Sequence, residues 1–286
     1  MQKTQRFTTR QSMREKQFEI FQYRDRKMKN VGVHHHDFYE VYFFLGGKVN
    51  FRVQGRFYTL EPGDLLLINP HELHEAQVDP EERYERIVLW IDRGFLRELG
   101  GSGCDLTACF DRTDPGCTNL LRPDPMQRAV VQNILEQMTE EYYGNRFASE
   151  LCARGLLIQF LVEINRMVQK QSENVTQHES PDIVSQVLSY IGTHYQEPIT
   201  LQSLADSFYI SRYYLSHEFS RRVGTSVYRY IIFKRLMYAK EMMDDGVSPG
   251  NVYQVCGFGD YANFYRAFKN EYGISPKAYF KTGCAE

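Results

Sequence analysis

Several features that define broad protein classes are absent from this sequence of 286 residues. Its start is polar and charged instead of an apolar leader, and no apolar run approaches the roughly 20 residues that span a bilayer. The six cysteines contain no C-x-x-C pair, and the loose group Cys104, Cys109 and Cys117 matches no common zinc motif. We therefore expect a cytoplasmic protein with free thiols and no membrane partner.

Net charge is also nearly absent, since 34 basic side chains face 36 acidic ones for a balance of −2. The whole chain thus lacks the basic excess typical of nucleic-acid-binding proteins. Residues 211–240 depart from this balance, because they hold seven basic side chains and a single acid, Glu218. A solvated helix face is one interpretation of such a run, and a patch for DNA phosphates is the other. The seven are Arg212, Arg221, Arg222, Arg229, Lys234, Arg235 and Lys240.

An internal repeat occupies the last third of the chain. In each copy a capping residue is followed by apolar residues four apart, which predicts a capped helix with one buried face. A shorter helix and a tight turn precede that helix, so the repeat predicts two helix-turn-helix units. Six pairs recur at an offset of 49 residues: Ser211 and Asp260, Leu215 and Phe264, Phe219 and Phe268, Gly224 and Gly273, Ser226 and Ser275, Tyr230 and Tyr279.

The second helix of such a unit enters the major groove of DNA with its exposed face. A stretch of 18 residues without Pro or Gly, 226–243, joins the copies. As a helix it would span about 27 Å, which suits two grooves about 34 Å apart. A helical hairpin whose polar face meets only water is the alternative for a single copy. The predicted DNA-contacting residues are Arg212, Tyr213, Ser216, His217, Ser220 and Arg221 in the first copy and Tyr261, Ala262, Asn263 and Arg266 in the second.

The second copy departs from the first in its short helix. Thr200 is a good N-cap for the first short helix, and Ser248 followed by Pro249 is its counterpart. Gly250 lowers helix propensity, and Tyr253 stands where the first copy has the small residue Ala205. We expect a looser core in the second copy and a larger contribution of the first copy to DNA binding.

The stretch Ser203–Phe280 resembles the DNA-binding domain of the AraC/XylS family of bacterial transcriptional regulators. The matching pieces are SLADSF, ISRYYLSHEFSRRVGTSVYRYI, RLMYAKEMM and GFGDYANFYRAFKNEYGISPKAYF. The resemblance implies promoter DNA as a partner, and RNA polymerase as another if the protein is an activator rather than a repressor. It also implies base contacts from Tyr213, Ser216 and His217 in the first copy and from Ala262, Asn263 and Arg266 in the second.

Residues 31–93 carry short apolar runs separated by Gly and Pro turns, which predicts an antiparallel barrel or sandwich. The motif H-x-H-x₃-E-x₆-G at His34, His36, Glu40 and Gly47 resembles the cupin pattern with its metal ligands. A second part follows with Pro62-Gly63-Asp64 and the candidates His71 and His74. On a strand, His34 and His36 would point to one face. The predicted strands are Val41–Leu45, Val49–Val53, Phe57–Leu60, Leu65–Ile68 and Ile87–Ile91.

Two functions fit this N-terminal half. In the first, His34, His36, Glu40 and His74 bind a small polar effector, a sugar or another metabolite, with no obligatory metal or cofactor. In the second, the same residues hold a metal in a cupin enzyme that carries a helical appendage. The repeat favours the ligand-responsive regulator without enzymatic activity, because an enzyme does not need two polar recognition helices.

The organisation that follows is a multidomain α+β protein. Residues 1–124 form the cupin-like sensing barrel, and residues 125–170 form a helical pair, Met126–Tyr143 and Ala148–Val168, that joins two chains in a homodimer. Residues 171–182 are polar and aperiodic, as in a linker. Residues 183–286 are the all-α domain with the two helix-turn-helix units.

Overall fold

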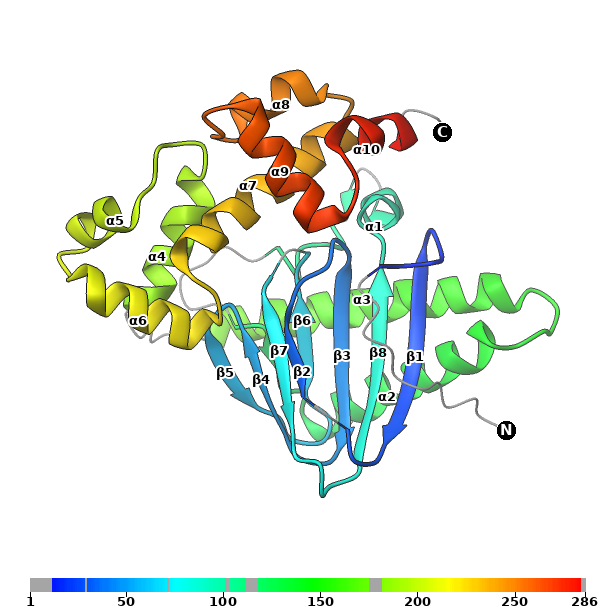
Figure 1. Cartoon of the computed structure of the whole chain (residues 1–286). Helices are drawn as coiled ribbons and strands as arrows, with labels where there is room; N and C mark the ends of the chain where they lie inside the picture. Colours follow the sequence, from blue (N-terminus) through cyan, green and yellow to red (C-terminus); the bar gives the residue numbers. More distant parts are fainter. Residues whose placement is uncertain are drawn as a thin grey trace. The chain divides into compact units, whose positions relative to one another are not determined.

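The computed structural model describes residues 12–28, 30–70, 72–100, 103–111, 118–174 and 182–283. The chain divides into two compact units, Met1–Pro181 and Asp182–Glu286 (Figure 1). His71 and most of the predicted linker lie outside the described residues. Within the described part, no helix is long and apolar enough to cross a membrane.

The N-terminal unit contains two antiparallel sheets. The described strands leave open edges in both sheets and form a sandwich, one of the two antiparallel arrangements that the sequence predicted. Each predicted strand overlaps an observed one, because alternation and turn residues mark strands reliably even where they do not fix the pairing. The first sheet has the order β1 (Phe18–Asp25), β8 (Tyr84–Ile91), β3 (Tyr39–Gly46), β6 (Leu65–Ile68), β9 (Leu120–Leu121), and the second β2 (Val31–His34), β7 (His74–Val78), β4 (Val49–Val53), β5 (Arg56–Thr59).

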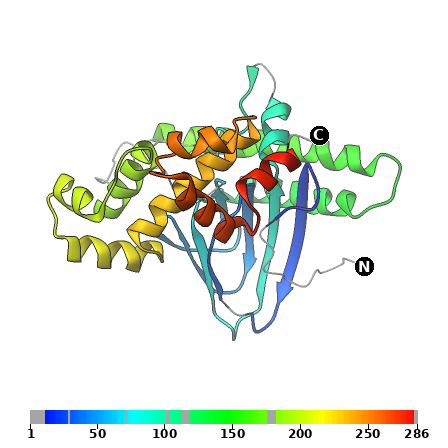
Figure 2. The ribbon, with the colours of Figure 1, turned by 45° about the horizontal axis from the view of Figure 1, so that its top comes forward.

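The five-stranded sheet is buried on both faces, which explains its continuous apolar sequences. Every residue from Tyr39 to Phe44 in β3 is buried, and so is all of β6. One face of this sheet packs on the four-stranded sheet, whose strands β4 and β5 alternate between buried and exposed positions. The opposite face packs on helices. The layers are therefore sheet, sheet and helices (Figure 2).

The helical layer consists of α1 (Arg93–Gly100), α2 (Pro125–Tyr142) and α3 (Ser149–Asn174). The bounds of α2 and α3 are close to those of the predicted helical pair. Asp124 caps α2 through its carboxylate, which accepts hydrogen bonds from two backbone N–H groups of the first turn. On these helices Val130, Leu151 and Ile158 are exposed. The buried positions that face the sheet include Ile134 and Met138 on α2 and Leu157 and Leu161 on α3.

The C-terminal unit is entirely helical, as predicted. The buried residues of the first helix-turn-helix include Leu204, Ala205, Leu215 and Phe219, and those of the second include Val252, Cys256, Phe264 and Phe268. Ile210, in the turn between the two helices of the first unit, is half-buried. The helices are α4 (Ile183–His194), α5 (Leu201–Ser207), α6 (Arg212–Val223), α7 (Val227–Asp244), α8 (Pro249–Val255), α9 (Tyr261–Tyr272) and α10 (Pro276–Gly283).

Side-chain caps stabilise the N-terminus of the second helix in each unit, α6 and α9. Ser211 accepts the Tyr214 N–H at 3.1 Å, and Asp260 accepts the Asn263 N–H at 2.7 Å. Both helices end at a left-handed glycine, Gly224 with φ 81° and Gly273 with φ 75°, a conformation that favours glycine. Ser248 occupies the predicted N-cap position of α8, but its hydroxyl makes no cap hydrogen bond, so this cap is weaker than the sequence predicted.

Candidate functional site

A cavity lies between the two sheets of the N-terminal unit, and its free volume is about 50 Å³. It is lined by five aromatic rings and by all four candidate ligand residues, His34, His36, Glu40 and His74. The space corresponds to about four water molecules, since one water needs on the order of 10–15 Å³ of such volume. The rings are those of Tyr23, Tyr42, Phe51, Tyr84 and Trp90.

The four candidate residues come from both sheets and from the chain between them. Glu40 lies on β3, and His74 on β7. His34 pairs directly with His74 across β2 and β7. His36 lies beyond the end of β2, so the expectation that His34 and His36 share one face of a strand was wrong: the chain leaves the ladder at His34 to cross between the sheets.

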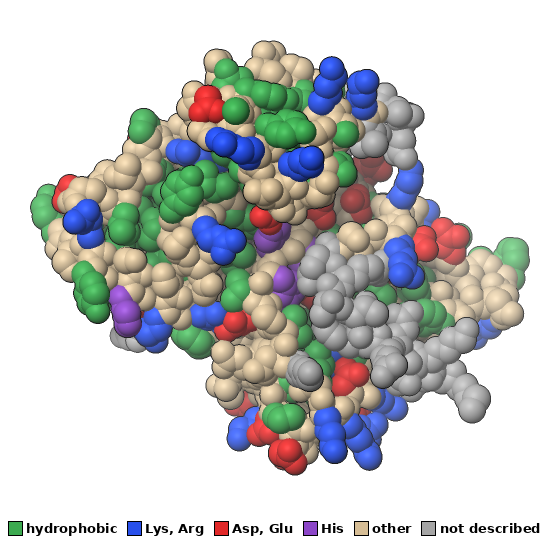
Figure 3. All heavy atoms as spheres, viewed as in Figure 1, with side chains coloured by type: hydrophobic (Ala, Val, Ile, Leu, Met, Phe, Trp, Pro, Cys, Tyr) green, Lys and Arg blue, Asp and Glu red, His purple; other side chains and the backbone are tan. Residues whose placement is uncertain are grey.

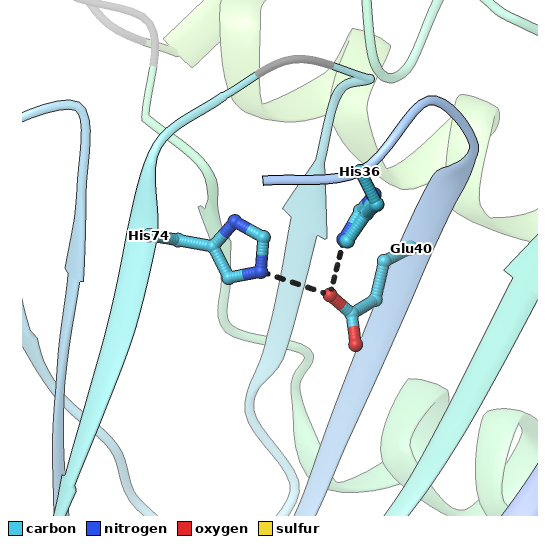
Figure 4. A group of neighbouring side chains, drawn as sticks. All are labelled: His36, Glu40 and His74. Carbon is cyan, nitrogen blue, oxygen red and sulfur yellow. Dashed lines mark hydrogen bonds and ion pairs between the residues drawn. The ribbon is translucent and has the colours of Figure 1, made fainter. Parts of the chain in front are cut away.

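Two of these imidazoles, those of His36 and His74, converge on one carboxylate oxygen of Glu40 (Figure 4). Nε2 of His36 lies 2.9 Å from Oε2 of Glu40, and Nε2 of His74 lies 3.3 Å from the same oxygen. The other oxygen of Glu40 accepts a hydrogen bond from the indole N–H of Trp90 at 3.2 Å. Glu40 and Trp90 are cross-strand neighbours on β3 and β8, so the sheet register fixes this contact.

Each imidazole is also oriented by a backbone carbonyl. Nδ1 of His36 lies 2.9 Å from the carbonyl oxygen of Phe38, and Nδ1 of His74 lies 2.8 Å from that of Glu72. His34 contacts the carbonyl of Gly32 in the same way, and its ring centroid lies 4.1 Å from that of His74. The rings therefore have fixed orientations, with each Nδ1 directed to a carbonyl.

Burial dominates the electrostatics of the cluster. It lowers the pKa of His34 to about 4, assisted by the nearby His74, and it also lowers the pKa of His74. Burial alone would raise the pKa of Glu40, but its contacts with His36 and His74 hold that pKa well below the usual range. At neutral pH the cluster thus contains a carboxylate beside neutral His34 and His74.

Tyr84, Arg86 and Trp90 line the cavity and were not predicted as cavity residues from the sequence. Arg86 is buried, donates to Asp25 at 2.7 Å, and lies over the rings of Tyr23 and Tyr84. The hydroxyls of Tyr42 and Tyr84 are also hydrogen-bonded to each other. Alternation alone places these side chains on the inner face, but their roles depend on strand order, which the sequence does not encode locally. Trp90 had a usable signal, since it is the only tryptophan in the chain.

In the C-terminal unit, the exposed faces of α6 and α9 carry the residues predicted to contact DNA. All ten are exposed, and Tyr213 is 83% exposed. The rings of Tyr213 and His217 stack with centroids 6.3 Å apart. Lys and Arg side chains are spread over the visible surface of this unit among exposed hydrophobic ones (Figure 3). Such a face offers hydrogen-bond donors and rings to a nucleic acid.

The basic run of the first copy is partly engaged within the protein. Arg221 donates two hydrogen bonds to Glu218, at 2.9 and 2.6 Å, and Arg222 binds both Glu218 and Asp182. These hydrogen bonds lower the pKa of Glu218 to about 2. Arg235 donates to the carbonyls of Tyr195 and Glu197. The seven basic residues therefore form a weaker phosphate patch than their number indicated.

The second copy holds its polar residues in a chain. Asp260 binds the side-chain amide of Asn263, and the oxygen of that amide accepts a hydrogen bond from Arg266 at 2.5 Å. Arg266 is therefore directed along the exposed face of α9.

Comparison with known proteins assigns both units. A family model described as an AraC-like ligand binding domain matches residues 19–161, and a helix-turn-helix domain model matches residues 204–282. The chain is 30% identical to the arabinose operon regulatory protein of Escherichia coli (strain K12) over 238 residues, which cover 82% of this chain and 76% of the relative. The chain belongs to the AraC family.

Two further similarities extend over most of the chain. The transcriptional activator RhaS of Yersinia pseudotuberculosis is 25% identical over 247 residues, covering 85% of this chain and 87% of the relative. The structure of ToxT from Vibrio cholerae matches 93% of this chain and 98% of its own, with 16% identity and a TM-score of 0.39.

Membership of the AraC family confirms the resemblance in the repeat and the two-part architecture. The protein is a transcriptional regulator with a helix-turn-helix DNA-binding domain and a ligand-binding domain built on antiparallel sheets.

Proposed function

We propose that this AraC-family protein is a cytoplasmic regulator without catalytic activity that binds promoter DNA through α6 and α9 under the control of a small polar effector. The observation that supports the proposed DNA contacts is the pair of exposed polar helix faces at equivalent positions of the repeat. They comprise Arg212, Tyr213, Ser216, His217, Ser220 and Arg221 on α6 and Tyr261, Ala262, Asn263 and Arg266 on α9.

The cavity supports a small effector bound near His34, His36, Glu40 and His74. Its aromatic rings provide flat apolar surfaces, and its imidazoles and carboxylate provide hydrogen-bonding groups, a combination that suits a sugar or another polar metabolite. The similarity to an arabinose operon regulator supports a carbohydrate. A monosaccharide exceeds about 50 Å³ of free space, so its binding requires the cavity to widen.

The helical pair 125–170 is the proposed dimerisation region. Leu151 is 67% exposed and Ile158 is 39% exposed on α3, seven residues apart, with half-buried Val162 one turn further on. An apolar stripe of this spacing suits packing against the same helix of a second chain. Acting as an activator, the bound dimer would contact RNA polymerase.

The DNA-binding proposal is tested with the full chain and DNA from upstream of its neighbouring genes. We expect sequence-specific binding. In a plot of the logarithm of the binding constant against the logarithm of salt concentration, each phosphate contact should make the slope more negative by nearly one unit. Arg212→Ala, at an exposed site on α6, should weaken binding, whereas Arg166→Ala, at an exposed site on α3, should not. Equal affinity for unrelated DNA would contradict the proposal.

The effector proposal is tested through Trp90, the only tryptophan and 8% exposed in the cavity. A ligand that enters the cavity should change the intrinsic fluorescence, so a panel of monosaccharides and small polar metabolites can be titrated directly. A ligand that causes a saturable fluorescence change and also alters promoter affinity is identified as the effector. Saturable fluorescence changes without any effect on DNA binding would argue against effector control.

A further inference from the structure

The contacts within the His36–Glu40–His74 cluster cannot all be hydrogen bonds in one neutral state. A carbonyl oxygen only accepts hydrogen bonds, so the Nδ1 atoms of His36 and His74 carry the proton in their contacts with Phe38 and Glu72. Each neutral ring then presents the lone pair of Nε2 to Oε2 of Glu40, which is itself an acceptor. Three acceptor atoms face one another.

Protons resolve this arrangement only in part. An added proton on His36 would let its ring donate to Glu40 across 2.9 Å. Nε2 of His74, which lies 3.3 Å from the same oxygen, makes no hydrogen bond, although the residue is only 3% exposed. Protonating both rings would leave two cations and one carboxylate in a buried site, with an excess positive charge that is costly to desolvate.

A metal cation satisfies all three atoms together, and the remaining contacts prepare the site for one. The potential ligand atoms of His36, Glu40 and His74 lie within 4.8 Å of one another. The backbone carbonyls fix both imidazoles with Nε2 directed inward, and Trp90 fixes the carboxylate through its other oxygen. Such outer contacts are typical of metal sites, where they orient the ligands and raise their basicity.

We propose that His36, Glu40 and His74, which line the cavity, bind one divalent transition-metal ion. Two imidazoles and one carboxylate suit Zn²⁺, Co²⁺, Ni²⁺ or Fe²⁺, whereas Mg²⁺ and Ca²⁺ prefer oxygen ligands. Three protein ligands leave positions for water, and the cavity of about 50 Å³ has room for a few water molecules. This inference departs from the sequence-based expectation of a site without an obligatory metal.

Metal binding can be tested on the untagged full chain without an effector or DNA. The chain is stripped with a chelator, dialysed and titrated with Co²⁺ while Trp90 fluorescence is recorded. An open-d-shell ion bound to Glu40 should quench the indole, which lies 3.2 Å from the carboxylate. We expect saturable quenching at one equivalent, displacement by Zn²⁺, which has a filled d shell, and no response to Mg²⁺. Elemental analysis after desalting should find one equivalent of Zn²⁺.

Substitutions assign the ligands. His36→Ala, His74→Ala and the isosteric Glu40→Gln should each weaken metal binding at least about tenfold, since even loss of an outer contact costs metal sites about 10–100-fold. His35→Ala, next to the cluster, is the matched control and should bind metal like the parent. Thermal unfolding of each metal-free variant separates a lost ligand from a lost fold, and the parent titration stands without any variant.

Absence of stoichiometric binding in the parent chain would overturn the proposal, as would a full equivalent retained by the His36→Ala/His74→Ala double variant. These outcomes are independent of effector control, because a metal-free chain could still bind promoter DNA and a metabolite. Conversely, a chain that binds Co²⁺ through the three residues but no promoter DNA would contradict only the proposed function.

Discussion

The two helix-turn-helix copies share the length and the ends of their second helices. They differ in the turn residue and in the side chains packed around the turn. α6 and α9 have 12 residues each, begin at a side-chain cap and end at a left-handed glycine. In the turn, Tyr209 of the first copy has φ 55° and is 96% exposed, whereas Gly257 of the second has φ 81° and lies against the backbone of residues 195–196. A repeat therefore preserves apolar spacing and helix ends, while local packing decides the turn residue.

The largest expected loss of folding stability comes from a substitution at Gly257. A Cβ there would lie 2.7 Å from the carbonyl oxygen of Gln196 and 2.8 Å from that of Tyr195. Gly257→Ala should destabilise the unit by about 2–5 kcal/mol, from left-handed strain of about 1–2 kcal/mol and a clash of about 1–3 kcal/mol. Urea denaturation of residues 182–286, followed by helical circular dichroism, measures the loss.

Gly273→Ala is the control for that experiment. Gly273 also has a left-handed φ of 75°, but a Cβ there would meet no atom within 4 Å. Its substitution should therefore cost only the strain of about 1–2 kcal/mol. Equal losses at the two glycines would show that a Cβ at residue 257 does not clash with the carbonyl oxygens of residues 195–196.

DNA affinity separates the copies next. We expect Ser216→Ala with His217→Ala to weaken promoter binding more than Asn263→Ala with Arg266→Ala, which should cost about 1–3 kcal/mol for each lost base contact. Asn263 and Arg266 are already hydrogen-bonded to each other, so their contacts with DNA gain less. Titrations on one promoter at fixed salt compare the double variants, and the reverse order would make α9 the main anchor.

Packing beneath the second helices gives a third comparison. Ala205 is 1% exposed between α5 and α6, so Ala205→Leu should overpack the first copy and cost about 1–3 kcal/mol. Tyr253, its counterpart, is half-buried with its ring against Tyr261, so Tyr253→Leu should cost about 1 kcal/mol or less. The same denaturation measures both, and a larger loss for Tyr253→Leu would place that side chain in the core.

The smallest effect concerns the caps of the short helices. Thr200 accepts the Ser203 N–H at 3.0 Å, and Ser203 Oγ accepts the Thr200 N–H at 3.0 Å. Thr200→Ala should cost about 1 kcal/mol. Ser248 makes no cap hydrogen bond, so Ser248→Ala should change stability by no more than about 0.5 kcal/mol. Indistinguishable losses would show that the Thr200 cap is worth little.

The helical half was predictable because its information is local. In each copy the cap, Ser211 or Asp260, the apolar residues four apart and the terminal glycine all belong to one helix, so they lie close together in the sequence. The missed details arise from contacts between distant segments. Arg222 meets Asp182, and Arg235 meets the carbonyls of Tyr195 and Glu197, so the charge run alone overestimated the residues free to contact phosphates.

In the N-terminal half, the sequence predicted the histidines and carboxylate of the cupin-like motif and the strands β3, β4, β5, β6 and β8, but not β1, β2, β7 and β9. The tertiary structure decided their arrangement. Pairing of β3 with β8 brings Trp90 to Glu40, pairing of β2 with β7 brings His34 to His74, and the crossing after His34 carries His36 to the same carboxylate. The period of a strand fixes only the face of each side chain, whereas partners across a sheet depend on strand order and register.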